Sequence, residues 1–300
     1  MINGSPQYRT AEAFRRALHA HVKAEHDRTG RLSEHLNREF AYQRFLALVF
    51  AAAPENWVLK GGGSLMFRRP GARFTRDLDL LNLDPVTANE AVAELRDLVR
   101  PQPGDHLTYV FNRVETQQDR DQASIRVIAS IGTTEFTRFD IDLVLNRPLR
   151  SAPDRVHPEP VIDMPGLPAM PVVLLHPVPD QLADKVCAMY EPHHGGHASS
   201  RYRDLHDLAL IIDTESLDAA RVLAALTHER KRRSLELPAA VTSPGLAWAK
   251  GYAKVVDGTS LPDHLRTLDG ALTAVGACMD PLLSGTRTTG TWEPRQGWRT

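Results

Sequence analysis

Two aspartates separated by one residue, Asp77 and Asp79, are the side chains of this chain around which chemistry is most readily built. They end the run Arg73-Phe74-Thr75-Arg76-Asp77-Leu78-Asp79, whose last residues alternate acidic and apolar, as β-strands do. Side chains at positions i and i+2 of a strand point to the same side, so both carboxylates could ligate or bridge divalent cations. Mg²⁺ prefers such oxygen ligands and takes substrate phosphates as further ligands.

A glycine-rich turn precedes the two aspartates. The apolar run 57–59 predicts a short strand, Lys60-Gly61-Gly62-Gly63-Ser64 follows it, and we expect a helix to begin near Leu65. A glycine turn before a helix lets backbone N–H groups approach a triphosphate, and the helix dipole favours the negative charge. Each signal is weak alone, but a strand, turn, helix, loop and Asp-x-Asp strand in succession are much more restrictive.

The last of three β-like runs supplies another pair of carboxylates. Residues 107–113, 123–132 and 135–146 have strand character. In the third run the apolar side chains face one side of the strand, whereas Asp140 and Asp142 face the other. Either aspartate could join the first pair.

Helical periodicity accounts for most of the remaining chain. The predicted helices cover residues 9–28, 33–53, about 86–99, 180–191, 201–213, 217–230, 245–256 and 262–278. We therefore predict an α+β fold. A mixed sheet with its N-terminal helices occupies residues 1–178, a helical region that completes the cleft occupies residues 179–284, and a tail without periodicity occupies residues 285–300.

The composition is that of an ordinary globular chain, with 42% hydrophobic and 24% charged residues. A net charge of −1 gives no global field for a polyanion, so such a partner would need a local patch. The basic run 228–233 is one candidate, although it is alternatively a solvated helix face. No apolar run approaches the roughly 18 residues of a membrane span, and the N-terminus lacks a secretory signal. With no such run, no membrane partner is expected. Cys187 and Cys278 are expected to be buried thiols in a reducing compartment, which predicts a cytoplasmic location.

Three histidines in a Gly/Ser-rich loop, His193, His194 and His197, have a spacing that invites comparison with zinc sites. Glu191 is their one acidic neighbour. We interpret the segment as a mobile loop near the cleft.

The motifs described above resemble the AbiEii/AbiGii family of nucleotidyltransferase toxins, which includes MenT-type toxins and belongs to the polymerase-β-like superfamily. The resemblance begins with Val58-Leu59-Lys60-Gly61-Gly62 and the run from Arg73 to Asp79. It extends to Asp142, Asp184-Lys185, Arg203-Asp204-Leu205-His206-Asp207 and, more loosely, Trp248-x-x-Gly251-Tyr252. It covers roughly residues 40–255 and implies the polymerase-β-like mixed sheet flanked by helices.

The resemblance implies roles for the residues of the first motifs. Asp77 and Asp79 would bind metal ions, and Asp142, favoured over Asp140, would be a further metal ligand or the general base. Gly61 and Gly62 would form the phosphate-facing turn. No phosphate role is expected for Ser64, which lies two positions after the place where the superfamily often has a serine, and Lys60 either touches phosphate or covers the strand end.

Thr75 occupies a Ser/Thr position near the triphosphate that an antitoxin kinase phosphorylates in some relatives. The alternative is a hydroxyl that caps the turn.

The helical half would contribute Lys185, which borders the apolar stripe of its helix, to the nucleotide site. In the next helix Asp204 flanks the apolar stripe, whereas Asp207 projects nearly opposite it. Asp204 is therefore the favoured partner of Lys185, but a shift of the helix start would exchange the two aspartates.

By this resemblance the chain is expected to be a metal-dependent nucleotidyltransferase toxin of a toxin–antitoxin system. It would transfer a nucleoside monophosphate from an NTP to the 3′ end of tRNA and block translation. The cofactor would be Mg²⁺, with two ions expected and Mn²⁺ as an alternative, and a cognate antitoxin would be the partner. Other hypotheses are a protein or small-molecule (antibiotic) acceptor, or a catalytically inactive nucleotide-binding module.

Overall fold

The computed structural model describes residues 8–69, 72–101, 106–192 and 198–300. The chain forms two compact units. Unit 1 comprises Met1–Arg68, Phe74–Pro148 and Arg155–Leu175, and unit 2 comprises Arg69–Arg73, Leu149–Asp154 and His176–Thr300. Two short segments that precede residue 155 therefore belong to the unit that holds the C-terminal helices, which helical periodicity does not indicate.

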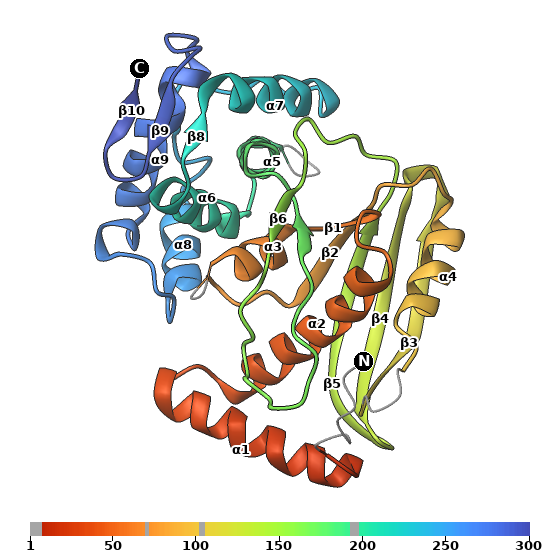
Figure 1. Ribbon diagram of the computed structural model, residues 1–300. Coiled ribbons are helices and arrows are strands. Elements are labelled where there is room, and N and C mark those ends of the chain that lie inside the picture. The colour runs from red at the N-terminus through yellow and green to blue at the C-terminus, as the bar shows by residue number, and fades with distance from the viewer. Residues whose placement is uncertain (1–7, 70–71, 102–105, 193–197) are drawn as a thin grey trace. The chain divides into compact units, whose positions relative to one another are not determined.

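A mixed β-sheet forms the framework of unit 1 (Figure 1). Its strands are β1 (Trp57–Lys60), β2 (Asp77–Asn82), β3 (Leu107–Gln117), β4 (Gln122–Ile131), β5 (Thr134–Val144), β6 (Asp154–Val156) and β7 (Val173–Leu175). Across the described residues they follow the order β3-β4-β5-β2-β1-β7-β6. β2 pairs parallel with β5 and antiparallel with β1, whereas β3, β4 and β5 pair antiparallel in succession. The mixed sheet with helices confirms the predicted fold class.

Aromatic side chains anchor the helices of unit 1 to this sheet. These helices are α1 (Ala11–Thr29), α2 (Ser33–Ala52), α3 (Gly61–Arg68) and α4 (Ala88–Leu98). Phe139 of β5 makes edge-to-face contacts with Tyr42 and Phe45 of α2, with ring centroids 5.0 and 5.7 Å apart. Each such pair contributes about 0.5–1.5 kcal/mol beyond its buried area. Because strand side chains alternate, the contact with α2 leaves Asp140 and Asp142 on the other face of β5.

The helix after β1 begins earlier than predicted, because the three glycines form its first turn. Gly61 has φ +57°, a left-handed conformation that turns the chain from strand to helix without the strain that a side chain would bring. Gly63 lies close against the core, where an added Cβ would come 3.1 Å from Leu59 Cδ1. The prediction that this helix begins near Leu65 is therefore wrong. Glycine has low helix propensity, but tertiary packing outweighs that propensity here.

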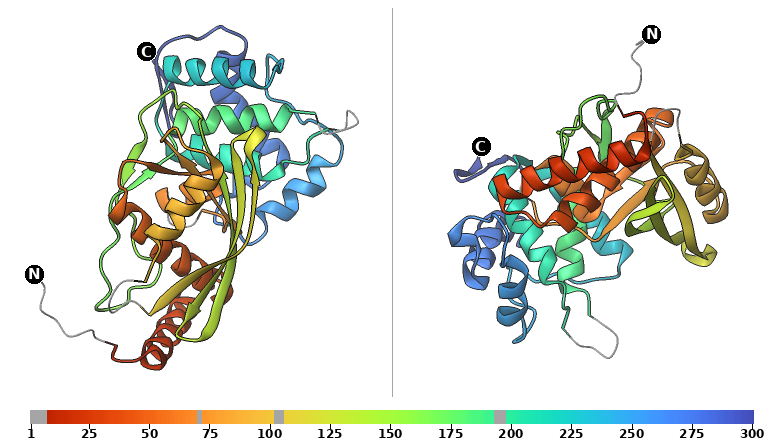
Figure 2. Two further views of the ribbon diagram at one scale, coloured as in Figure 1. Left: turned by 90° about the vertical axis from the view of Figure 1, so that its right-hand side faces the viewer. Right: turned by 90° about the horizontal axis from the view of Figure 1, so that it is seen from below.

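Unit 2 is a helical bundle with α6 at its centre. Its helices are α5 (Val178–Tyr190), α6 (Tyr202–Thr214), α7 (Ala219–Arg232), α8 (Trp248–Val256) and α9 (Leu268–Leu283). α6 contacts α5, α8 and α9, and α5 also contacts α7, alongside which it lies in Figure 2. Because α6 has neighbours on several sides, residues outside its apolar stripe are buried as well.

The last residues of the chain form a small sheet, although their sequence shows no period. β9 (Thr291–Glu293) pairs antiparallel with β10 (Gly297–Arg299) and with β8 (Leu217–Asp218). Trp292 and Trp298 pack edge to face, and their indole N–H groups donate to the carbonyl oxygens of Ile212 (2.9 Å) and Cys278 (3.0 Å). Strands of three residues are too short for alternation to be visible in the sequence.

Cys187 and Cys278 are buried free thiols, as predicted. Throughout the part of the chain that the structure describes, no helix has the length and apolar character needed to cross a membrane.

Replacing Trp292 by alanine tests whether the C-terminal hairpin stabilises unit 2. We expect Trp292→Ala to lower the free energy of unfolding by about 3–5 kcal/mol, because a buried indole and its hydrogen bond are lost. Urea denaturation followed by circular dichroism measures the change. Arg299→Ala in the same hairpin is exposed and should stay within about 0.5 kcal/mol of the wild type. Equal stabilities of the two variants would show that the hairpin is an appendage.

Candidate active site

Parallel pairing of β2 with β5 brings the predicted carboxylates of unit 1 together. Asp77 is the partner of Asp140 in the register, and Asp79 is the partner of Asp142. Side chains of paired residues in neighbouring strands lie on the same face, so all four carboxylates share the face of the sheet away from the Phe139–α2 contact. We call Asp77, Asp79 and Asp142 on this face the carboxylate face.

Asp140 and Asp142 differ in their partners. Both oxygens of Asp140 accept hydrogen bonds from the Arg126 guanidinium, at 2.7 and 2.8 Å. Asp142 accepts one hydrogen bond, from Ser124 Oγ at 3.1 Å, and its side chain is exposed. Although the residue is exposed, neighbouring protein atoms partly desolvate the carboxylate, which raises the pKa of Asp142. The Ser124 hydrogen bond opposes the rise, and the charges of Asp77 and Asp140 add to it. The geometry therefore favours Asp142 as the carboxylate open to a cation.

Asp79 lies directly against the glycine turn. A Cβ on Gly61 would overlap the Asp79 carboxylate, and Lys60 is the register partner of Asp79 on β1. Position 61 therefore requires glycine for two reasons, its positive φ and its contact with Asp79. Ser64 is fully buried and its hydroxyl donates to the Gly61 carbonyl at 3.0 Å, which accounts for this side chain by a structural role.

Thr75 orients Asp77. The Thr75 side chain is 3% exposed, and its hydroxyl donates to Asp77 Oδ1 at 2.9 Å. The Tyr42 hydroxyl in turn donates to the Thr75 carbonyl at 3.4 Å. The Thr75 hydroxyl thus connects the segment before β2 to the Asp77 carboxylate.

The carboxylate face presents oxygen ligands of the kind that Mg²⁺ prefers. Within residues 8–69, 72–101, 106–192 and 198–300, no three His, Cys, Asp or Glu side chains are grouped tightly enough to hold a metal ion unaided. At phosphate-handling sites Mg²⁺ needs only one or two carboxylates, because water and substrate phosphates complete its octahedron. The residues therefore fit a Mg²⁺ that binds together with a nucleotide, and they do not fit an ion held by the protein alone.

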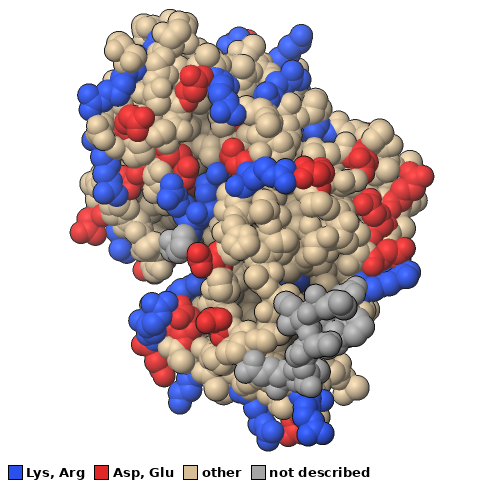
Figure 3. Space-filling view, in the orientation of Figure 1, with Lys and Arg blue, Asp and Glu red and all other residues tan. Residues whose placement is uncertain are grey.

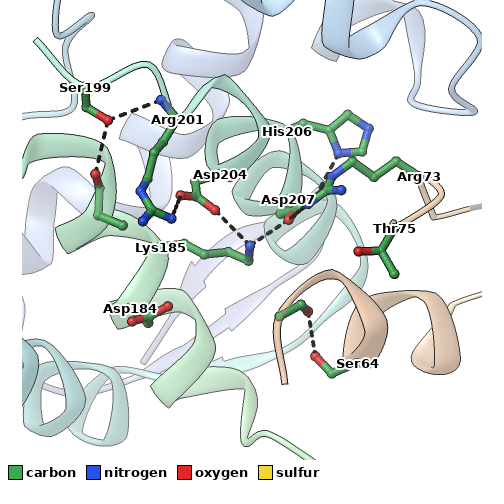
Figure 4. Close-up of polar contacts among 12 residues, drawn as sticks. Ser64, Arg73, Thr75, Asp184, Lys185, Ser199, Arg201, Asp204, His206 and Asp207 are labelled. Atoms are coloured by element: carbon green, nitrogen blue, oxygen red, sulfur yellow. Dashed lines mark hydrogen bonds and ion pairs between the residues drawn. The ribbon is translucent and has the colours of Figure 1, made fainter. Parts of the chain in front are cut away.

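A second polar cluster lies in unit 2 around a buried lysine (Figure 4). Lys185 Nζ donates to Asp204 Oδ1 at 3.0 Å and to Asp207 Oδ2 at 2.6 Å. Both aspartates pair with Lys185, so the structure does not force the choice between them that the sequence posed. We call these three residues and Arg73 the lysine cluster.

Arg73 is the member of the lysine cluster that sequence reasoning missed. Its guanidinium binds both oxygens of Asp207, through Nε at 2.8 Å and Nη2 at 2.7 Å. Lys185 and Arg73, with Arg201 3.7 Å from Asp204 Oδ2, oppose the negative charge of the two aspartates. Arg73 belongs to the run from Arg73 to Asp79. The one sequence signal for its role is that a later helix carries more acidic side chains than Lys185 alone can pair with.

The prediction that Asp207 projects away from the core is wrong. Asp207 is completely buried, and besides Lys185 and Arg73 it contacts His206, whose Nδ1 lies 3.2 Å from Asp207 Oδ1. The helical wheel correctly placed Asp207 off the apolar stripe, but α6 has neighbours on several sides. A residue opposite the stripe is thus buried as well.

The charges of the lysine cluster depend on one another. Burial on its own would lower the pKa of Lys185, but Asp207 and Asp204 raise it above its usual value while Arg73 opposes them. Burial would likewise raise the pKa of Asp207, but Arg73 and Lys185, with hydrogen bonds from His206 and Arg73, hold it well below its usual range. Lys185 and Asp207 are therefore both ionised at neutral pH.

Two other sequence candidates have different outcomes. The histidine loop, His193 to His197, lies outside the described residues. In the basic run 228–233, Arg233 is engaged within unit 2, where it pairs with Glu229 and Asp184, both at 2.6 Å. That arginine stabilises the bundle, whereas Arg230 and Lys231 are exposed.

Gly61→Ala tests the contact between the glycine turn and Asp79. We expect a loss of about 2–4 kcal/mol in the free energy of unfolding, because backbone strain adds to displacement of the Asp79 carboxylate. Gly30→Ala is the matched control, since Gly30 has φ +72° in unit 1 with no atom near an added Cβ. It should cost about 1 kcal/mol by strain alone. Equal losses in urea denaturation would contradict a specific contact at Gly61.

The pKa of Asp207 predicts how stability depends on pH. Its folded pKa is lower than its unfolded value of about 3.9, so ionised Asp207 stabilises the fold above that pH, and this stabilisation disappears as the pH falls through the folded value. Asp207→Asn should be less stable than the wild type at pH 7 and lose less stability between about pH 5 and pH 2. Parallel curves for Asp207→Asn and the wild type would contradict the assignment.

Comparison with known proteins relates this geometry to a family. The family model described as "Nucleotidyl transferase AbiEii toxin, Type IV TA system" matches residues 44–274. MenT4, nucleotidyltransferase toxin Rv2826c from Mycobacterium tuberculosis H37Rv, has a similar fold, with a TM-score of 0.58 and 17% identity over 90% of this chain and 89% of that one. JHP933 from Helicobacter pylori matches less well, with a TM-score of 0.45 and 16% identity over 82% of this chain and 90% of that one. No curated protein matches. Because the family model spans most of the chain, the protein belongs to the AbiEii family of nucleotidyltransferase toxins and is a nucleotidyltransferase of a toxin–antitoxin system.

Proposed function

We propose that the protein transfers a nucleoside monophosphate from an NTP to a hydroxyl at the 3′ end of tRNA, with Mg²⁺ as cofactor. The observation that carries the proposal is the pairing of Asp79 with Asp142 beside Gly61. This arrangement combines carboxylate oxygens that can bind cations with a glycine turn that phosphate groups can approach closely. Phosphoryl transfer depends mainly on such positioning and charge stabilisation.

The carboxylate face would hold the metal ions. Asp77 and Asp79 would be ligands, and Asp142 would complete the site or accept the proton of the attacking hydroxyl. Bound Mg²⁺, as two ions or with Mn²⁺ in its place, would neutralise the charge that develops on the transferred phosphate. Thr75 would keep Asp77 oriented through its 2.9 Å hydrogen bond.

Gly61 and Gly62 would bind the triphosphate. They open α3, and a helix N-terminus favours an anion because the helix dipole is positive there. The absence of side chains at these positions allows the closest approach of phosphate oxygens to the backbone.

Lys185 would donate to a phosphate oxygen while Asp204 and Asp207 fix its position. An ammonium group has three N–H donors, and the two aspartates use two of them. Arg73 balances the charge of Asp207. The third N–H of Lys185 would then serve the substrate.

An RNA acceptor is supported by the charge distribution of unit 2. An open hollow of about 480 Å³ is lined by the exposed cations Lys250, Lys254 and Arg266, and Asp257 also lines it. On the face drawn in Figure 3, cations and acids are mixed, in keeping with the net charge of −1. A local cationic site of this kind suits a polyanion. Extension of the tRNA 3′ end would prevent aminoacylation and so block translation, in the cytoplasm, where tRNA is charged.

A cognate antitoxin would control the activity. If it is a kinase acting on Thr75, the buried hydroxyl must first leave Asp77. The phosphate would then add about −1.5 to −2 charges beside the carboxylate face and repel the nucleotide.

Substitutions of single carboxylates test the proposed reaction. We expect Asp79→Asn and Asp142→Asn each to reduce transfer of label from α-labelled NTPs to tRNA by at least about 10²-fold, because ligands to the metal are lost. Asp140→Asn is the matched control on the same face, and it should change the rate by less than about tenfold, because Asp140 is paired with Arg126.

The arms of the same assay separate the acceptors. Each NTP is tested with tRNA, with other RNA and without RNA, and Mg²⁺ or Mn²⁺ is removed with chelator and restored. Labelled protein or aminoglycoside in reactions without RNA would replace tRNA as the acceptor. Transfer that survives chelation, or that is equal in Asp79→Asn and Asp140→Asn, would refute the proposed site. No transfer under any condition would indicate an inactive nucleotide-binding module.

A further inference from the structure

A cavity in unit 1 is separate from the carboxylate face and from the motifs of the sequence. It has a volume of about 260 Å³ and lies between α2 and the proline-rich segment 157–170. Phe40, Ile162, Met164 and Met170, all buried, contribute apolar walls. A pocket of this size lies just below the range for drug-sized ligands, so it suits a molecule smaller than a nucleotide.

Among the described residues that line this cavity, Arg44 is the one lysine or arginine, and His157 is the one histidine. Its side chain is 7% exposed, and Nη1 donates to the Pro168 carbonyl at 3.0 Å. Nε is buried without a hydrogen-bond partner, and no described carboxylate forms an ion pair with the guanidinium. Glu159 and Asp163 also line the cavity, but both are exposed and neither pairs with Arg44.

The wall opposite α2 is held in place independently of any ligand. The Gln43 side chain donates to the Glu159 carbonyl and accepts from the Val161 N–H, both at 2.8 Å. These two bonds fix the backbone of the segment across the cavity, so the pocket exists before a ligand arrives.

A buried cation without a counter-ion is unfavourable, because it loses hydration without gaining an ion pair. The planar guanidinium matches a carboxylate in shape and hydrogen bonding. We propose that this cavity is a binding site for a small organic carboxylate with an apolar body, whose carboxylate pairs with Arg44 while its body contacts the apolar walls. The site is independent of the proposed transferase reaction, and its tests do not use activity.

Matched acids and amides test the chemistry of the site. Benzoate and 4-methylpentanoate are titrated into the full chain by saturation-transfer NMR and calorimetry, with benzamide and 4-methylpentanamide as neutral counterparts. We expect at least one acid to bind with a dissociation constant of about 1 mM or tighter, and its amide to bind at least tenfold more weakly. Failure of both acids to bind at about 10 mM, or equal binding of acid and amide, would overturn the proposal.

Variants at position 44 locate the binding. Arg44→Met should abolish binding of the acids, and Arg44→Lys should weaken it at least tenfold, because an ammonium lacks the bidentate geometry. Arg113→Met, which removes an exposed arginine of β3, should bind as the wild type does. Undiminished binding to Arg44→Met would refute the site.

Thermal unfolding provides a readout that a purely structural Arg44 would not give. Without ligand, Arg44→Met should unfold at the same or a higher temperature than the wild type, because an unpaired buried charge is removed. Benzoate should raise the unfolding temperature of the wild type and leave that of Arg44→Met unchanged. A clearly lower unfolding temperature for ligand-free Arg44→Met would show that the arginine serves the fold and would count against the proposal.

Discussion

The parallel register between β2 and β5 is the constraint on which the candidate active site depends. It sets Asp79 beside Asp142 and Asp77 beside Asp140, and a slip of one residue would turn one set to the opposite face. Like charges on adjacent strands repel, so the fold must offset this repulsion. Arg126 neutralises Asp140, whereas Thr75 and Ser124 donate hydrogen bonds to Asp77 and Asp142. The negative charge that these contacts leave on the carboxylates can attract a cation.

The lysine cluster also holds like charges close together, in this case in a buried site. Lys185, Asp204, Asp207 and Arg73 are removed from water, and their charges are tolerated because each carboxylate faces a cation at hydrogen-bonding distance. Removing one member would leave a buried partner uncompensated. The chain passes from unit 2 to unit 1 after Arg73, so the arginine that completes the cluster is attached to the segment leading to the carboxylate strand.

Sequence reasoning found the parts of the site that local pattern encodes. Alternation along the strands put Asp140 and Asp142 on the face opposite Phe139, and the contact of Phe139 with α2 agrees with it. It did not find that the helix begins at Gly61, since glycine propensity argues against it. It also missed the C-terminal hairpin, whose tryptophans are ordered by hydrogen bonds to carbonyl oxygens of Ile212 and Cys278. In each miss, a contact distant in sequence outweighed a local preference.

The amino-acid sequence alone determined the fold class, because periodicity is a property of short stretches of chain, and the resemblance of its motifs to a known family indicated the family. The partners of the charged side chains were decided by the tertiary structure. These pairings join segments whose spacing in the sequence carries no signal. They are Arg126 with Asp140, Arg73 with Asp207, and Lys185 with Asp204 and Asp207. A charged side chain is stabilised by the nearest opposite charge in space, and that neighbour exists only once the strands and helices have packed.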